Sequence, residues 1–116
     1  MNNNIKLWID ALRSGEYKQG RRKLKNGDTY CCLGVLCDLY AKETGKGKWR
    51  EDDQFLTDGR TSAFNLPLDV MKWAGVCLSE GRFAYGGKSL VALNDEGKSF
   101  SDIAEIIESE PEGLLK

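Results

Sequence analysis

Four cysteines carry the strongest intrinsic chemistry in this sequence, either as metal ligands or as nucleophiles. Cys31, Cys32 and Cys37 lie in one apolar stretch, TYCCLGVLCDLY, and Cys77 is distant from them. A zinc site needs four converging ligands, usually from paired C-x-x-C turns, and this spacing provides none. We interpret the cysteines as small apolar side chains of the core and expect no metal site. Cys31 is the best candidate for a reactive thiol, since cations from the preceding basic segment would lower its pKa.

The chain contains no histidine, which removes the commonest general base near neutral pH. This absence excludes Ser-His-Asp and Cys-His catalytic arrangements and every zinc site with a histidine ligand. Asp52, Asp53 and Asp58 occur in a turn-rich segment, but they do not fit the register of a calcium-binding loop. No glycine-rich phosphate-binding motif occurs either. We therefore predict no catalytic residue and no cofactor, and we expect binding rather than catalysis.

A basic segment, SGEYKQGRRKLK, is the best candidate for a binding site. Between positions 13 and 25 the chain has six basic residues and one acidic residue. Guanidinium groups fork onto phosphate, lysines add point charge, and aromatic rings stack on nucleobases. The predicted ligand-binding residues are Lys18, Arg21, Arg22 and Lys23 for phosphate, and Tyr17, Tyr30 and Trp49 for a base. The same charges also fit an edge strand that is protected against pairing, so this alternative stays open.

The C-terminal part of the chain has the opposite charge, with seven acidic residues and one lysine between positions 95 and 112. The segment SLVALNDEGKSFSDIAEII has the outline of a helix-turn-helix. Its second helix would carry Asp102, Glu105 and Glu108, which DNA phosphates repel. We expect this helix to close the core with its acidic face in solvent.

Periodicity and capping signals predict five helices. A first helix is capped by Asn3 or Asn4 and ends at Gly15, and a second, mostly buried helix spans residues 32–44. A short helix has Pro67 at its first position, and Ser89 and Ser99 cap two more helices.

Turn signals predict a β-hairpin and several short strands. The Asn26-Gly27 pair is a strong hairpin signal between arms at residues 21–25 and 28–31. Residues 46–65 are polar and turn-rich, which indicates an ordered loop with short strands, and a further strand is expected at residues 82–85. Residues 1–116 should therefore form one α+β domain, with several helices packed against a small antiparallel sheet or hairpin.

The length and composition of the chain allow a real core without disulfides. No run of about 18 apolar residues predicts a membrane-spanning helix, so we expect no membrane partner. The N-terminal residues lack the apolar region of a secretion signal. We expect a location in the cytoplasm, where cysteines stay reduced.

The strings ALRSGEYKQG, YCCLGVLCDLY, LPLDVMKWAG and SLVALNDEGKSFSDIAEIIE resemble a family of small proteins encoded by phages and prophages. The resemblance covers most of the chain apart from residues 46–65 and the C-terminal tail. It implies a viral protein that acts in a bacterial cytoplasm, and it carries over no catalytic residue.

This context favours a counter-defence protein that sequesters a small anionic ligand, namely a nucleotide immune signal, with homo-oligomerisation doubling the cations of a shared site. Inhibition of a host protein, through the acidic helix or the Trp49 loop, is the alternative. Binding of nucleic acid by the basic hairpin and a phosphodiesterase-like or thiol-dependent enzyme are further hypotheses.

Overall fold

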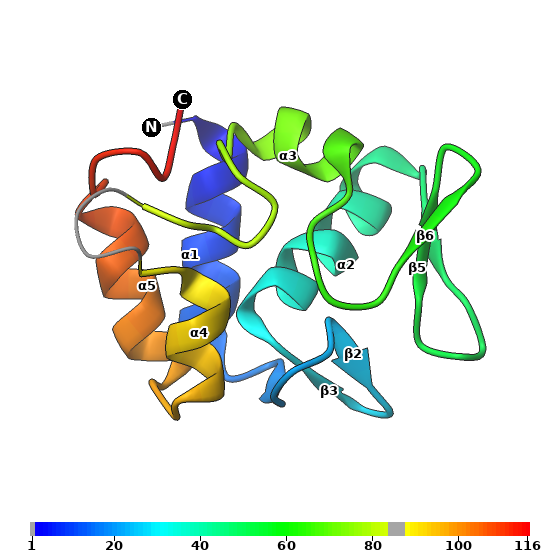
Figure 1. The fold of residues 1–116 in the computed structure, drawn as a ribbon, viewed down its shortest axis with the longest axis horizontal. Helices are drawn as coiled ribbons and strands as arrows, with labels where there is room; N and C mark the ends of the chain where they lie inside the picture. The colour runs from blue at the N-terminus through cyan, green and yellow to red at the C-terminus, as the bar shows by residue number, and fades with distance from the viewer. Residues whose placement is uncertain (1, 84–87) are drawn as a thin grey trace.

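The computed structural model describes residues 2–83 and 88–116, and these ranges contain five helices and six short strands (Figure 1). The helices are α1 (Asn3–Ser14), α2 (Cys32–Thr44), α3 (Leu68–Ala74), α4 (Leu90–Asp95) and α5 (Phe100–Glu108). The strands are β1 (Lys18–Gln19), β2 (Lys25–Asn26), β3 (Thr29–Tyr30), β4 (Lys48–Trp49), β5 (Phe55–Thr57) and β6 (Arg60–Ser62). The arrangement confirms the predicted α+β class and the predicted single small domain.

The strands form two small sheets at different places along α2 (Figure 1). In the first sheet β3 is central, pairing in parallel with β1 and antiparallel with β2. In the second sheet β5 is central and antiparallel to both β4 and β6. Figure 1 places the first sheet near the N-terminal end of α2 and the second beside its C-terminal half. The loop expected between residues 46 and 65 therefore contains the short strands that were predicted.

The first helix forms where the sequence predicts it, because its apolar residues recur on one face. Ile5, Trp8, Ile9 and Leu12 are all buried. Burial of side chains of this size contributes about 1.5–3 kcal/mol each. The Trp8 indole N–H donates a 2.9 Å hydrogen bond to the carbonyl of Cys32, which joins α1 to the start of α2. The N-cap is Asn2 rather than Asn3 or Asn4, and its side chain accepts from the N–H of Ile5.

The second helix is the core of the molecule, and every residue from Cys32 to Asp38 is buried. It contacts α1, α3 and α4 as well as strand β3. A helix that is buried on several sides needs neighbours whose backbone approaches closely. Gly34 permits such an approach, since a Cβ atom there would overlap the carbonyl oxygen of Leu24.

A fully buried asparagine, Asn94 at the end of α4, connects three separate segments. Its side-chain oxygen accepts from the backbone N–H of Cys32 at 3.1 Å and from the Gln19 amide at 3.0 Å. Its amide nitrogen donates to the carbonyl of Gly20 at 2.8 Å. Asn94 therefore supplies a partner to one of the free amides at the N-terminus of α2, and it holds the residues around position 20 against α4.

The predicted hairpin exists, but its strands are shorter and its turn is shifted by one residue. Asn26 pairs with Thr29, so Gly27 and Asp28 form the turn instead of Asn26 and Gly27. Of the strand predicted at residues 21–25, only Lys25 lies in a strand, and the prediction is wrong for residues 21–24. The reason is that residues 21–23 form a tight turn, in which the N–H of Lys23 donates to the carbonyl of Arg21 at 2.9 Å. The N–H of Leu24 donates to the carbonyl of Ala63 at 2.8 Å, while the Leu24 carbonyl accepts from the N–H of Cys31 at 3.2 Å. Leu24 itself is fully buried.

Most predicted helix ends are confirmed because they depend on local hydrogen bonds. Gly15, Gly45 and Gly75 end α1, α2 and α3 in the left-handed conformation. Ser89 and Ser99 cap α4 and α5 as expected. Pro67 lies one position earlier than expected, as the N-cap of α3. Of the strand expected at residues 82–85, Arg82 forms a single bridge with Ser89, and residues 84 and 85 lie outside the described ranges.

The two ends of the chain lie beside each other (Figure 1). Leu115 bridges to Val76, and the N–H of Lys116 donates to the carbonyl of Gly75 at 2.8 Å. The amide of Asn2 donates to the carbonyl of Ala74, also at 2.8 Å. Both ends are therefore attached to the end of α3. None of the helices in residues 2–83 and 88–116 is long and apolar enough to cross a bilayer.

Replacement of Gly34 by alanine is expected to lower the free energy of unfolding by about 3 kcal/mol, since the new methyl group must displace the backbone of Leu24. Gly27→Ala is the matched control. Gly27 has a positive φ of 63°, unlike the helical Gly34, and open space around its Cβ position, so about 1 kcal/mol is expected there. Urea unfolding followed by tryptophan fluorescence measures both. Equal losses in the two variants would contradict the close approach of Leu24 to α2.

Candidate functional site

Three aromatic residues predicted to bind a base, Tyr17, Tyr30 and Trp49, are brought together in the structure. The ring centroids of Tyr17 and Tyr30 are 5.2 Å apart, and those of Tyr30 and Trp49 are 5.9 Å apart. Both pairs meet edge to face, an arrangement that aromatic rings favour inside proteins. Trp49 continues the row to the buried ring of Phe55, with centroids 4.9 Å apart. The three residues therefore form one cluster, which is packed against the core.

The polar ends of this cluster converge on Asp38, a buried carboxylate of α2. The Tyr17 hydroxyl donates to Asp38 Oδ2 at 2.6 Å, and the Trp49 indole N–H donates to Oδ1 at 3.1 Å. The Lys42 ammonium, one turn further along α2, is 3.0 Å from Oδ2. A buried charge is tolerated when it is paired and hydrogen-bonded in this way. Asp38 thus holds Tyr17 and Trp49 in place, and stacking of a base on these rings stays a prediction.

The four cations predicted to bind phosphate lie on or just after β1. Lys18 is on β1, where its ammonium is 4.0 Å from Asp28, and 72% of its side chain is exposed. Arg21, Arg22 and Lys23 follow in a turn outside the sheet, and all three are exposed. The central strand β3 carries Tyr30 and pairs with β1, so the sheet connects the cations to the aromatic cluster. The structure brings the cations together in one group and the aromatic rings together in another.

The cysteines are placed as core residues, which confirms the structural interpretation of Cys31, Cys32 and Cys37. Burial raises the pKa of the Cys31 thiol to about 11, and this effect exceeds that of its backbone hydrogen bonds. The expected lowering of the Cys31 pKa by the basic segment therefore does not occur. Within residues 2–83 and 88–116, no three His, Cys, Asp or Glu side chains are grouped so that they could hold a metal ion.

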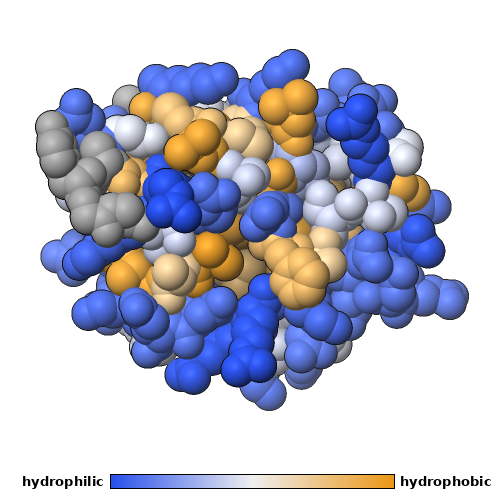
Figure 2. All heavy atoms as spheres, viewed as in Figure 1, coloured by the Kyte–Doolittle hydropathy of each residue, from blue (hydrophilic) through white to orange (hydrophobic). Residues whose placement is uncertain are grey.

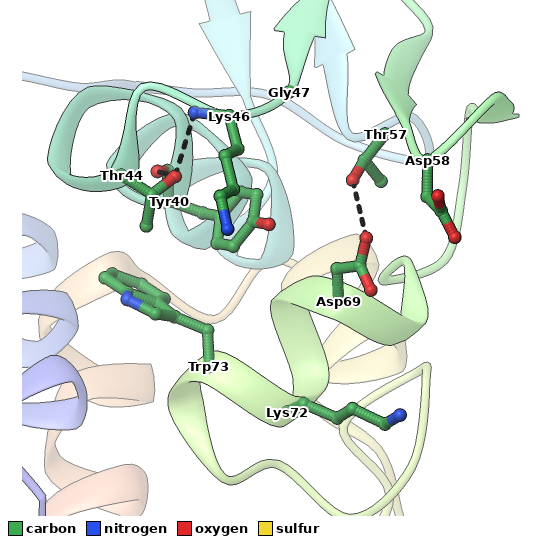
Figure 3. Close-up of a pocket in the computed structure, with 9 residues that line it drawn as sticks. All are labelled: Tyr40, Thr44, Lys46, Gly47, Thr57, Asp58, Asp69, Lys72 and Trp73. Atoms are coloured by element: carbon green, nitrogen blue, oxygen red, sulfur yellow. Dashed lines mark hydrogen bonds between the residues drawn. The ribbon is translucent and has the colours of Figure 1, made fainter.

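A pocket of about 620 Å³ opens between α2, the second sheet and α3, and we call it the α2–α3 pocket. This volume lies within the range of about 300–1,000 Å³ that is usual for small-molecule sites. The lining residues are Tyr40, Thr44, Lys46, Gly47, Thr57, Asp58, Asp69, Lys72 and Trp73 (Figure 3).

The walls of the α2–α3 pocket combine aromatic rings with hydrogen-bonded polar groups. Tyr40 and Trp73 meet edge to face with centroids 5.6 Å apart. The Thr57 hydroxyl donates to Asp69 at 3.0 Å, which joins β5 to α3 across the pocket. Figure 3 shows the Tyr40 hydroxyl pointing into the space between Lys46 and Asp69. The pocket is thus held between elements whose relative positions are set by the core.

Several charged groups at the α2–α3 pocket are not used by the fold. Among the described residues, the ammonium groups of Lys46 and Lys72 have no ion pair or hydrogen bond, and the Asp58 carboxylate has none either. Asp58 also has a left-handed backbone, with φ 51°. Two free cations, a free carboxylate and the hydroxyl of the largely buried Tyr40 therefore line one hollow together with aromatic rings. This combination can bind a ligand that has a ring, an anionic group and N–H donors.

None of the residues of the α2–α3 pocket belonged to the predicted site. Asp58 lies in the segment predicted to be a turn-rich loop, and Tyr40 lies in the helix predicted to be mostly buried. The local signals were Gly45 and Gly47 around Lys46 and the Thr57-Asp58-Gly59 turn, because such turns often carry exposed functional groups. These signals do not show that the segments meet.

The Tyr17 hydroxyl is expected to ionise at about pH 12, because burial and then the hydrogen bond to Asp38 raise its pKa. An unfolded tyrosine ionises near pH 10, so Tyr17 contributes stability that is fully present below about pH 10 and is lost as the pH rises towards 12. In Asp38→Asn the pKa should move back towards the ordinary value, although burial keeps part of the increase.

Tyrosinate absorbance measured against pH tests this expectation. Burial also raises the pKa of Tyr30, so Tyr17→Phe is needed to identify the component that belongs to Tyr17. A component that is lost in Tyr17→Phe and that ionises near pH 10 in the unaltered protein would contradict the Asp38 contact.

Comparison with known proteins identifies one family. The family model described as Domain of unknown function (DUF8296) matches residues 1–111. No curated protein and no solved structure matches the chain. The matched range includes Asp38 with the aromatic cluster, the basic turn at residues 21–23 and the α2–α3 pocket. The chain therefore belongs to the DUF8296 family.

Proposed function

We propose that this protein is a non-enzymatic binding protein that sequesters a small nucleotide in the α2–α3 pocket. The observation that carries the proposal is the set of charged groups without partners, Lys46, Lys72 and Asp58, around a hollow with aromatic walls. Sequestration needs affinity and a formed pocket, but it needs no general base. It is consistent with a chain that has no histidine.

The aromatic walls supply the contact for a base. Tyr40 is buried at the inner wall and Trp73 is partly exposed, so part of the indole is accessible from the pocket. Stacking of a base on an aromatic ring contributes about 1–3 kcal/mol, and it is tolerant of base identity. The backbone carbonyl of Trp73 accepts a 2.9 Å hydrogen bond from Asn4, which fixes this end of α3 on α1. The ring is therefore presented from a rigid position.

The free lysines supply the contact for phosphate. Lys46 belongs to the Gly45–Gly47 turn after α2, and Lys72 belongs to α3, so the two lysines line the pocket from different elements. Figure 3 shows the Lys46 side chain extending beside the ring of Tyr40. A phosphate group near both lysines would replace the solvent contacts of two charges that have no other partner.

The carboxylates account for the remaining specificity. Asp58 and Asp69 accept hydrogen bonds and cannot donate them when ionised. A ligand here must therefore present N–H groups as well as negative charge, as the amino groups of adenine, guanine and cytosine do. Inorganic phosphate alone would meet the lysines but would be repelled by the two acids. The mixed charge favours a nucleotide over a simple anion.

The biological context of the proposal comes from the resemblance to small phage and prophage proteins. A viral protein that binds a nucleotide signal of host immunity would act in counter-defence by keeping that signal from its receptor. The expected place of action is the bacterial cytoplasm. A homo-oligomer would place a second set of cations near the ligand.

A second candidate function, inhibition of a host protein, is favoured by exposed hydrophobic side chains. Phe64, Leu68 and Leu78 are 55%, 57% and 46% exposed. The segments that carry them are joined by a 2.8 Å hydrogen bond from the N–H of Leu66 to the carbonyl of Ser79. Figure 2 shows hydrophobic atoms reaching the surface of this face around α3 and the segment before it. Exposed apolar groups of this kind are common in protein interfaces.

The double variant Lys46→Glu/Lys72→Glu should bind the nucleotide about 100-fold more weakly, since two charge-assisted contacts of about 1.4 kcal/mol each are lost. Lys6→Glu/Lys116→Glu is the matched control, because it makes the same change of net charge at two exposed lysines outside the pocket. Isothermal titration with the bound nucleotide measures both variants. Equal weakening in the two would refute the location of the site.

Native mass spectrometry with a panel of linear and cyclic nucleotides and ADP-ribose derivatives identifies the ligand to use. A stoichiometric adduct of unchanged ligand mass is expected, and the same spectrum gives the oligomeric state. A ligand that is converted during incubation would indicate an enzyme. No adduct, together with a stoichiometric protein captured from host lysate, would favour the inhibitor instead.

A further inference from the structure

The basic turn at residues 21–23 has a backbone conformation that an arginine rarely adopts. Arg22 has φ 73°, in the region that favours glycine. The N–H of Lys23 donates to the carbonyl of Arg21 at 2.9 Å, which closes a three-residue γ-turn. A γ-turn with positive φ at its centre is rare and strained. Glycine at position 22 would avoid this strain, which makes the arginine side chain a candidate for a functional role.

The turn is fixed from both sides by hydrogen bonds to distant segments. Asp95 accepts from the backbone N–H of Arg22 at 2.7 Å. Before the turn, the N–H of Gly20 donates to the carbonyl of Tyr30 at 2.7 Å. After the turn, Leu24 is buried and bonded to Ala63. The backbone that carries the three cations is therefore rigid before any ligand arrives.

The side chains on this turn are free. Arg21, Arg22 and Lys23 are exposed, and within the described part of the chain none of them has an ion pair or a side-chain hydrogen bond. Asp95 accepts from the backbone N–H of Arg22 and not from its guanidinium. The fold thus holds a strained turn in place while leaving its three positive charges available.

We propose that the basic turn binds the phosphodiester backbone of a single-stranded nucleic acid. Two guanidinium groups and an ammonium group on successive residues match successive phosphates, and arginine forks favour phosphate oxygens. All three residues are exposed, so an extended strand that lies across the turn can meet their charges. This site is separate from the α2–α3 pocket and does not depend on the nucleotide proposed there.

The aromatic cluster lies next to the turn in a position suited to the same strand. Tyr30 is bonded through its carbonyl to Gly20, and the Lys25 ammonium lies 6.0 Å from the centre of its ring. Tyr17, Tyr30 and Trp49 are each only partly buried. Single-stranded nucleic acids are bound by this pairing of a basic track with aromatic rings. A folded duplex would bring more phosphates near the acidic face of α5, where Asp102 and Glu105 are exposed.

The decisive variant is Arg22→Gly, which removes one charge and relieves the strain. Anisotropy of a short fluorescent oligothymidine, measured over a series of salt concentrations, reports the binding. Three phosphate contacts predict a slope of log K against log salt of about −2. The affinity at 0.1 M salt should therefore be about 100-fold higher than at 1 M salt. Arg22→Gly should reduce this slope by about 0.7 and should unfold at the same temperature as the unaltered protein or a higher one.

Two further variants complete the test. Lys6→Ala, which removes an exposed cation of α1, should leave the slope unchanged. The triple variant Arg21→Ala/Arg22→Gly/Lys23→Ala should remove nearly the whole slope. An unchanged slope in the triple variant would overturn the proposal, and so would a lower unfolding temperature of Arg22→Gly, because the arginine would then serve the fold. Equal binding of polyglutamate with the same dependence on Arg22 would overturn the nucleic acid in favour of an acidic protein.

Discussion

The burial of α2 is the constraint on which the rest of the structure depends. The residues of α2 from Cys32 to Asp38 are all buried. Water therefore does not hydrogen-bond to the first backbone amides of this helix or to the groups packed against it. Each surrounding segment must then supply apolar contact or a hydrogen bond to it. Trp8 bonds to the carbonyl of Cys32, Asn94 bonds to its N–H, and Leu24 packs its backbone against Gly34. The positions of α1, α4 and the basic turn follow from these three contacts.

Two buried polar side chains determine which surface groups meet. Asn94 joins α4 to the chain around Gly20, so the acid that follows it, Asp95, reaches the backbone of Arg22. Asp38 gathers Tyr17 and Trp49 at the other side of α2. Satisfied buried polar groups of this kind specify one arrangement, because any other arrangement would leave them without partners. No buried side-chain nitrogen or oxygen among the described residues lacks a partner.

Charges are divided between those that stabilise the fold and those that remain free. Lys25, for example, pairs with Asp53 at 3.0 Å, while Asp53 also accepts from the N–H of Gly27 and so attaches the second sheet's loop to the hairpin. The cations without a partner include the three of the basic turn and two at the α2–α3 pocket. A surface cation with no partner has no cost to the fold and retains its full electrostatic attraction for a ligand.

The local sequence was sufficient to predict most of the secondary-structure elements. The spacing of Ile5, Trp8, Ile9 and Leu12, the serine caps and the terminal glycines predicted five helices, because helix periodicity and capping involve residues three or four apart. The absence of histidine and the poor spacing of the cysteines directed the interpretation away from catalysis and towards binding. The hairpin was found but its turn was misplaced by one residue, since the hairpin also bonds to distant segments, as Leu24 does to Ala63 and Gly27 to Asp53.

Only the tertiary structure determines which functional side chains become neighbours of one another. Tyr17, Trp49 and Asp38 come from three segments, and nothing in their local sequence shows that one carboxylate accepts from both rings. Lys46, Asp58 and Lys72 were unremarkable as separate residues and became a candidate site only when α2, β5 and α3 brought them around one pocket. The sequence by itself determined the elements and the class of chemistry that the chain can perform. Which side chains share a site depended on long-range packing around α2, because only that packing brings together residues that are far apart along the chain.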